Sequence, residues 1–128
     1  MGREVNEIRL SEKKIQDGIT VALQLRGWHV ERLVGFALQR GLPDLMAFHP
    51  KFSYRFIEVK RPKGYRFTKA QVDKFPKLVA HGVGIWVLTC WEDNELAKLF
   101  QPPNLSQFLD ISKYPSDDVD KLLADITL

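Results

Sequence analysis

Two carboxylates and an amine stand at a spacing that would bring them into one pocket. Asp44 closes a turn sequence, GLPD at 41–44, while Glu58 and Lys60 lie two residues apart in a stretch typical of a buried strand, FIEVK at 56–60. Side chains at positions i and i+2 of a strand point to the same face, so Glu58 and Lys60 are predicted to project toward Asp44 while Val59 packs behind them. Such a group suits a hard divalent cation and the hydrolysis of a phosphodiester.

The same residues also have purely structural interpretations. A Gly-x-Pro-Asp sequence is a common turn, and Lys60 could simply form a salt bridge with Glu58 or with Asp44. A buried strand normally excludes charges, because an unpaired charge is costly to remove from water. The two charged residues in an otherwise apolar run therefore favour a functional pocket over a chance arrangement.

Secondary-structure patterns indicate the elements that must position this pocket. Ser11 is a predicted N-cap for an amphipathic helix that ends near Gly27. Thr68 and Gln71 form a predicted capping box that opens a second helix running to about residue 80. The predicted strands cover residues 28–34, 45–49, 54–59 and 85–89, with a hairpin at 50–53. The order is α-β-β-β-α-β, an α/β fold with a mixed central sheet flanked by helices.

Four further expectations concern individual segments. Pro76 lies beyond the first turn of the second helix, so we expect a bend or break near Phe75. The near-continuous apolar strand at 85–89 is expected in the middle of the sheet. A short helix is predicted at 95–100, and the acidic but apolar-rich segment 101–128 is expected to dock on the domain or on a second subunit.

Positive charge is concentrated around the suspected acids. The net charge of the chain is only +3, but residues 51–77 contain nine Lys or Arg residues and only two acids, Glu58 and Asp73. A charge run is often plain solvated surface, yet here it is interleaved with aromatic residues and borders a candidate metal site. This combination favours a polyanion such as DNA. The predicted DNA-binding residues are Lys63, Tyr65, Arg66, Lys69 and Lys74.

Length and composition exclude several other classes of protein. The chain of 128 residues fits one domain, and no apolar run approaches the roughly 20 residues of a membrane span. The first residues lack the apolar core of a signal peptide, and Cys90 alone cannot form an internal disulfide. His29, His49 and His81 are too widely spaced for a local zinc motif. A cytoplasmic protein without a membrane partner is the expectation.

Several segments together resemble a known family. GLPD at 41–44, FIEVK at 56–60 and FTKAQ at 67–71 are similar to the three core motifs of the virus-type replication-repair nuclease (VRR-NUC) family, within the PD-(D/E)XK nuclease superfamily. SEKKIQ at 11–16 with LQLRGW at 23–28 resembles the first helix and following strand of that family. HGVGIWV at 81–87 resembles its last core strand. The resemblance covers about residues 11–87 and implies a PD-(D/E)XK restriction-endonuclease-like fold.

The resemblance also implies a role for each matched residue. Asp44 and Glu58 would bind Mg²⁺ or Mn²⁺ together with the backbone carbonyl of Val59. Lys60 would position or polarise the attacking water, either as a base or as an electrostatic stabiliser. Gln71 would hold the geometry near the scissile phosphate, and Glu12 would be an additional acid.

Two of these roles have structural alternatives. Glu12 lies in the first turn of a helix, where the helix dipole alone favours an acid. Gln71 occupies the third position of a capping box and could simply bond Thr68, so the capping and phosphate-facing roles compete for one side chain.

The function that these observations predict is that of a metal-dependent, structure-specific DNA endonuclease. Residues 1–100 would form the nuclease domain, and residues 101–128 an acidic extension that packs on it or on a dimer partner. Similarity to Holliday-junction resolvases predicts a homodimer acting on branched DNA in a bacterial or phage-infected cell. The alternatives are a monomeric nuclease directed to flaps or nicks, a nucleic-acid-binding module without catalysis, and a protein-interaction domain.

Overall fold

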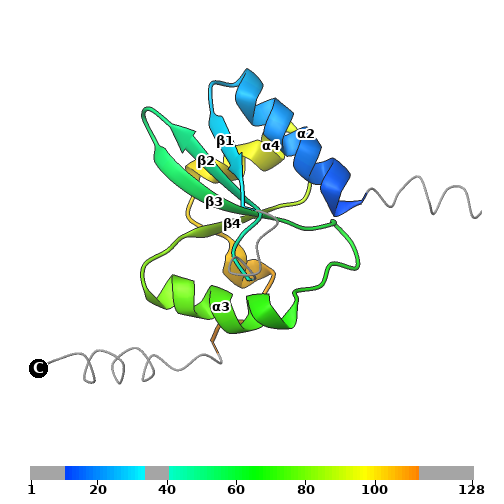
Figure 1. Cartoon of the computed structure of the whole chain (residues 1–128), viewed down its shortest axis with the longest axis vertical. Helices are drawn as coiled ribbons and strands as arrows, with labels where there is room; N and C mark the ends of the chain where they lie inside the picture. Colours follow the sequence, from blue (N-terminus) through cyan, green and yellow to red (C-terminus); the bar gives the residue numbers. More distant parts are fainter. Residues whose placement is uncertain (1–10, 34–40, 113–128) are drawn as a thin grey trace, which may run out of the picture.

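The structure of this protein, a computed structural model, describes residues 11–33 and 41–112. A four-stranded mixed sheet stands between α2 on one side and α3 on the other (Figure 1). No helix in these two ranges is long and apolar enough to cross a membrane. The elements in chain order are α2 (Glu12–Leu25), β1 (His29–Arg32), β2 (Leu45–His49), β3 (Ser53–Val59), α3 (Lys69–Ala80), β4 (Ile85–Leu88), α4 (Asp93–Leu96), η2 (Ala97–Phe100) and η3 (Leu105–Gln107).

The helix α2 begins at the predicted cap and covers one face of the sheet. Ser11 Oγ accepts a hydrogen bond from the Lys14 amide, which satisfies one of the free N–H groups of the first turn. Ile15, Ile19 and Leu23 recur at helical spacing and are buried. They pack with sheet residues and with Trp28 in the larger of two apolar clusters.

The register of the sheet sorts side chains onto two faces. β1, β2 and β3 pair in antiparallel fashion, and β3 pairs in parallel with β4. Because side chains alternate along a strand, Ala47 and Ile57 point into the cluster beneath α2. Phe56, on the opposite face, packs with Phe75 of α3 in the second cluster. β1 is shorter than the strand predicted at 28–34, and residue 34 lies outside the described ranges.

The predicted capping box of α3 is confirmed, whereas the predicted break is wrong. The Thr68 side chain accepts a hydrogen bond from the Gln71 amide, and the Gln71 side chain accepts one from the Thr68 amide. The helix continues through Pro76 to Ala80. Pro76 is itself buried, as is its neighbour Phe75, so apolar packing against the sheet compensates for the backbone hydrogen bond that the proline removes.

β4 is an edge strand, not the central strand predicted from its composition. The strand order is β1-β2-β3-β4, yet all four residues of β4 are buried. The Asn104 side chain accepts a hydrogen bond from the Val87 amide (2.6 Å) and donates one to the Val87 carbonyl (3.0 Å). One side chain thus takes the place of a neighbouring strand. The apolar composition of β4 reflects cover by the C-terminal segment.

The start of the C-terminal extension packs on the domain. Leu105 is buried against Phe75, Ile85 and Val87. The predicted short helix at 95–100 is present as α4 followed by η2. Residues 113–128 lie outside the described ranges, and the predicted boundary at residue 100 stays a prediction.

Candidate active site

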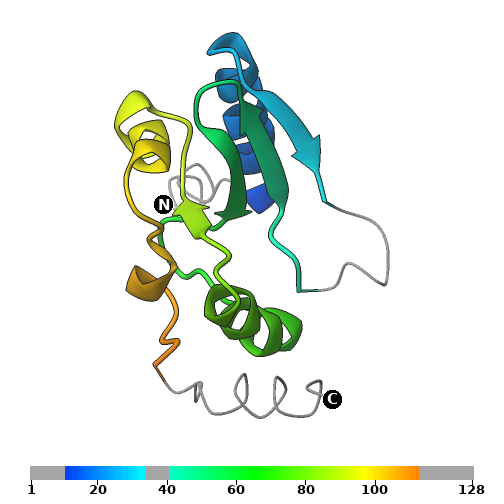
Figure 2. The ribbon, with the colours of Figure 1, turned by 90° about the vertical axis from the view of Figure 1, so that its left-hand side faces the viewer.

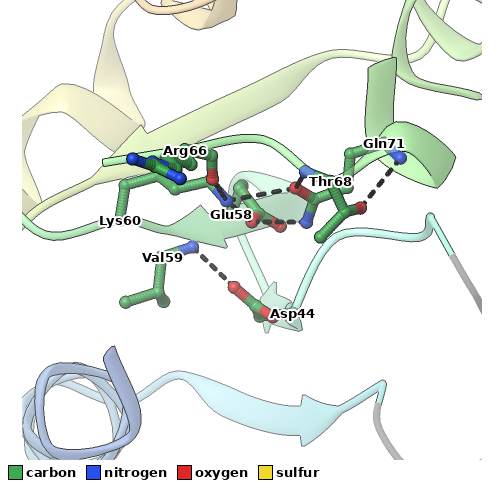
Figure 3. A network of polar contacts seen from close by, with 7 residues as sticks. All are labelled: Asp44, Glu58, Val59, Lys60, Arg66, Thr68 and Gln71. Carbon is green, nitrogen blue, oxygen red and sulfur yellow. Dashed lines mark hydrogen bonds and ion pairs between the residues drawn. The ribbon is translucent and has the colours of Figure 1, made fainter. Parts of the chain in front are cut away.

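Asp44 and Glu58 face one another at the end of the β2–β3 ladder. Leu45 pairs with Ile57, which places Asp44 next to Glu58 in the same antiparallel register. Asp44 Oδ2 accepts a 2.8 Å hydrogen bond from the Val59 amide (Figure 3). The predicted convergence of the two carboxyl groups on one strand end is therefore present, with Glu58 buried and Asp44 half-buried.

Gly41 holds the loop that carries Asp44 against α3. Its backbone is in the left-handed region, with φ of +80°. A Cβ at this position would lie 2.7 Å from the Ala70 carbonyl oxygen and 3.2 Å from Lys74 Cβ. The turn sequence thus needs glycine for two reasons, its backbone angle and the close approach of the helix. This contact brings the Asp44 loop beside the first turn of α3.

Lys60 is buried and is surrounded by acceptors. Its Nζ lies 2.7 Å from the Arg66 carbonyl oxygen, 3.1 Å from Gln71 Oε1 and 3.1 Å from Glu58 Oε2 (Figure 3). The amine also lies 4.5 Å from the centre of the Phe67 ring, a cation–π contact. An ammonium has three N–H donors, so these three oxygens match its full donor capacity.

Gln71 caps α3 and contacts both charged residues of the pocket, while its role near the scissile phosphate stays a prediction. Its Oε1 accepts hydrogen bonds from the Thr68 amide (3.0 Å) and from Lys60 Nζ (3.1 Å), while its Nε2 donates to Glu58 Oε2 (2.8 Å). A carbonyl oxygen has two lone pairs, so one conformation caps the helix and holds both charged residues.

Sequence reasoning missed the two groups that complete the surroundings of Lys60. These are the Arg66 carbonyl oxygen and the Phe67 ring. Every residue type has a backbone carbonyl group, so the sequence does not show which carbonyl will contact Lys60. The ring had a possible signal, because Phe67 immediately precedes the Thr68 cap and therefore lies where α3 meets the pocket.

Burial dominates the electrostatics of the carboxyl pair. It raises the pKa of Asp44 above its ordinary value, although the Val59 amide and the Lys60 ammonium lower it. Burial, with Asp44 as the next contribution, raises the pKa of Glu58 to about 8, against the opposing effects of Lys60 and Gln71. The ion pair with Lys60 alone therefore does not keep Glu58 ionised at neutral pH. A bound cation would oppose the effect of burial and lower the pKa of both carboxyl groups.

The donor set fits Mg²⁺ or Mn²⁺ on two grounds. Glu58 Oε1 is buried and has no hydrogen-bond partner among residues 11–33 and 41–112, and Asp44 lies beside it. Mg²⁺ typically takes one or two protein carboxylates and keeps several waters. These ranges contain no cluster of three or more His, Cys, Asp or Glu residues, so the site offers two carboxylates.

The structure does not bring Glu12 into contact with this pair. It is the first residue of α2 and is half-buried, and its side chain forms no hydrogen bond or ion pair with another described residue. Its assignment as an additional acid stays a prediction, as does the assignment of the Val59 carbonyl as a ligand.

The predicted DNA-binding residues lie in the loop after Lys60 and on α3. Lys63, Arg66 and Lys69 are exposed, and Lys74 is half-buried. The Tyr65 ring packs edge-on against Phe67 and Phe108, with ring centres 6.1 and 5.4 Å apart. Tyr65 therefore has a packing role in addition to any contact with DNA.

Arg55 belongs to the basic segment 51–77 but has a structural role. Its guanidinium donates hydrogen bonds to the carbonyl oxygens of Leu99, Phe52 and Tyr54, and it lies 4.8 Å from the centre of a Trp86 ring. It links β3 to η2 and is not part of the pocket.

The fold agrees with the predicted architecture. A mixed sheet between helices, with an acid before one strand and a Glu-x-Lys sequence at the end of the next, is the predicted PD-(D/E)XK-like architecture. The solved structure of a protein described as "VRR_NUC domain" has a similar fold, with a TM-score of 0.56 and 21% sequence identity over 70% of this chain and 94% of that chain. The predicted resemblance to VRR-NUC domains is thus confirmed for the fold. No protein-family model matches the sequence, and no curated protein matches it significantly.

Proposed function

We propose that this protein is a Mg²⁺- or Mn²⁺-dependent DNA endonuclease that hydrolyses phosphodiester bonds in branched DNA. The observation that carries the proposal is the Asp44–Glu58 pair beside the Lys60 ammonium, in which the buried Glu58 Oε1 has no partner among the described residues. The fold shared with a VRR_NUC domain supports the same reading.

Each residue of the pocket has a separate task in this proposal. Asp44 and Glu58 would hold the cation, which when bound supplies charge that stabilises the phosphate and activates water. The Val59 amide orients Asp44, and Gln71 orients Glu58. Lys60, with three hydrogen bonds to oxygen acceptors, acts as a fixed positive charge near the scissile phosphate. This favours the electrostatic role of Lys60 over that of a base, which would need a free lone pair.

The proposed substrate class rests on the exposed basic residues. Lys63, Arg66 and Lys69 are exposed on the loop after Lys60 and at the start of α3, where they would contact the DNA backbone. Because backbone contacts carry no base sequence, DNA shape is the feature to be recognised.

A homodimer would present two such sites to a four-way junction. An exposed apolar groove of about 580 Å³ lies along α2. Val21 is 54%, Leu25 80% and Trp91 39% exposed at this groove. Exposed apolar side chains of this kind are typical of an interface, and a closed two-fold dimer is the commonest assembly.

A cleavage assay tests the proposal. The protein is incubated with four-way junction, flap, duplex and single-stranded DNA in Mg²⁺, Mn²⁺, Ca²⁺ or EDTA. We expect junction cleavage in Mg²⁺ or Mn²⁺ and none in EDTA. Asp44→Asn and Lys60→Ala should abolish cleavage, whereas Asp93→Asn, at an exposed acid of α4, should not.

The outcomes separate the alternatives. DNA binding without metal-dependent cutting would indicate a binding module, and full activity of Asp44→Asn or Lys60→Ala would reject the assigned site. Sedimentation of the wild-type protein and of Leu25→Glu tests the dimer. A wild-type monomer at micromolar concentration that prefers flaps would replace the junction proposal by a flap-directed nuclease.

A further inference from the structure

Three rings form a row across the sheet face that points away from α2. His29 pairs with Phe48, and Phe48 pairs with Tyr54, so these side chains share one face of β1, β2 and β3. Phe48 is 37% and Tyr54 51% exposed. In Figure 2, which shows this side of the sheet, no described helix lies in front of β1 and β2.

The row lies on the same face as the candidate catalytic acids. Asp44 immediately precedes β2, and Met46 and Phe48 follow at alternate positions, so all three lie toward this face; all three are at least partly exposed. Asp44 and Phe48 are four residues apart, which is roughly 13 Å along an extended strand. This separation equals about four stacked nucleotides at 3.4 Å per step. A strand of DNA whose phosphate lies at Asp44 would therefore reach the ring row.

The surroundings of the row suit bases better than phosphates. The nearby Glu31 carboxylate is within 2.7 Å of His29 Nε2, and the two side chains form a pair. The exposed basic residues Lys63 and Arg66 follow Lys60 in the chain and do not belong to the strands that carry the row. The row therefore offers ring faces next to an acid, a surface that suits bases. Aromatic rings stack on any base, because every base has a π-face.

We propose that the His29–Phe48–Tyr54 row binds unpaired bases about four nucleotides from the scissile phosphate. This inference rests on the proposed nuclease function and specifies which part of a branched substrate the protein holds. It predicts that a single-stranded arm increases affinity, because only unstacked bases can lie on the rings.

A fluorescent adenine analogue placed at successive positions of a single-stranded arm tests the inference. Binding is measured in EDTA, so that no cleavage occurs. We expect fluorescence quenching to be greatest about four nucleotides from the scissile bond found in the cleavage assay. Phe48→Ala with Tyr54→Ala should weaken binding of the arm about tenfold or more, the usual range for stacked bases, while leaving a four-way junction without unpaired bases cleaved at the wild-type rate.

Matched variants separate stacking from general apolar contact. Phe48→Trp should retain arm binding, whereas Phe48→Leu, which keeps the apolar surface but loses the ring, should weaken it. Phe100→Ala serves as the control, because Phe100 is also exposed but packs with Trp28 in the ring cluster on the α2 side of the sheet. Thermal unfolding shows that each variant is folded.

Each result has a distinct meaning. Unchanged arm binding in the double Ala variant overturns the inference, as does a Phe48→Leu protein that binds the arm like the wild type. A double variant that becomes monomeric while the wild type is dimeric identifies the row as a contact between copies and also overturns it. A wild-type protein that quenches the arm but cuts no DNA refutes the nuclease proposal and leaves the stacking surface supported.

Discussion

Gln71 Nε2 donates a 2.8 Å hydrogen bond to Glu58 Oε2, which ties the first turn of α3 to the end of β3. The Gln71 carbonyl oxygen at the same time accepts from the Thr68 amide and from Lys60. Helix capping and the geometry of the pocket therefore depend on one side chain. The folding of α3 and the placement of the two charged residues are coupled for this reason.

Replacing Gln71 should separate these two effects. Gln71→Ala removes the capping contact and leaves Lys60 and Glu58 each with one partner fewer, so we expect a loss of about 2–4 kcal/mol in unfolding free energy. DNA cleavage should fall by about 10- to 100-fold, as for other residues that orient metal ligands. Urea denaturation and cleavage rates measure the two quantities.

Thr68→Ala is the matched control for Gln71. It removes the cap hydrogen bond to the Gln71 amide but not the contact with Glu58, so it should cost about 1 kcal/mol. Equal loss of cleavage in the two variants would show that Gln71 acts only through helix stability.

Glu58 should make the stability of the metal-free protein depend on pH. Its pKa is 4.5 in the unfolded reference and about 8 in the folded protein. Between these values the folded state binds the extra proton, so stability decreases as pH rises from 4.5 through 8. Glu58→Gln cannot ionise and should flatten this slope. Urea denaturation in EDTA from pH 5 to pH 8.5 measures it, with Glu92→Gln as an exposed control. If the unfolding free energy falls equally with rising pH in Glu58→Gln and in the wild type, the pH dependence belongs to another group.

Replacing Gly41 should lower the cleavage rate by more than the strain of its backbone angle alone would cause. Gly41→Ala forces an L-residue into the left-handed region, at about 1–2 kcal/mol, and also places Cβ against the Ala70 carbonyl. Gly64 has a similar φ, +67°, but nothing lies within 4 Å of its added Cβ. Gly64→Ala therefore carries only the backbone cost.

We expect Gly41→Ala to displace the Asp44 loop and lower the cleavage rate by about 100-fold, the effect of a misplacement near 1 Å. Gly64→Ala should lower stability without a comparable loss of rate. Similar rates for the two variants would show that the contact with α3 does not position Asp44.

Replacing Asn104 should lower the unfolding free energy, because this residue contributes to the stability of the fold rather than to the chemistry of the pocket. Asn104→Ala leaves the buried Val87 amide and carbonyl without their partner, which should cost about 2–5 kcal/mol for the two groups together. Asn94→Ala, at an exposed position of α4, should change stability by less than about 0.5 kcal/mol. Thermal and urea unfolding compare them, and equal stabilities would show that water replaces the amide.

The sequence predicted the parts of the fold that local patterns determine. Ser11 and Thr68 marked the helix starts correctly because capping depends on residues within one turn. The alternation around Glu58 placed it correctly on the face of Asp44. The order and types of the core elements follow from the same patterns.

The errors lie where distant contacts override local pattern. Pro76 does not end α3, because tertiary packing keeps the helix intact. The apolar composition of β4 predicts a central strand, because a buried strand usually has a neighbouring strand on each side. Here the Asn104 side chain covers the open edge from 17 residues away. The Arg66 carbonyl near Lys60 could not be predicted either, because it depends on the path of a loop.

The two edges of the sheet differ in how they are protected from other chains. At β4, the Asn104 amide already occupies the Val87 groups that an incoming strand would need. At β1, the strand has only four residues and ends in Glu31 and Arg32, and short, charged edges resist pairing. Growth of the sheet by addition of strands from a second molecule is thus disfavoured at both ends. During folding at high concentration, the protein should depend on Asn104 reaching β4 to avoid aggregation.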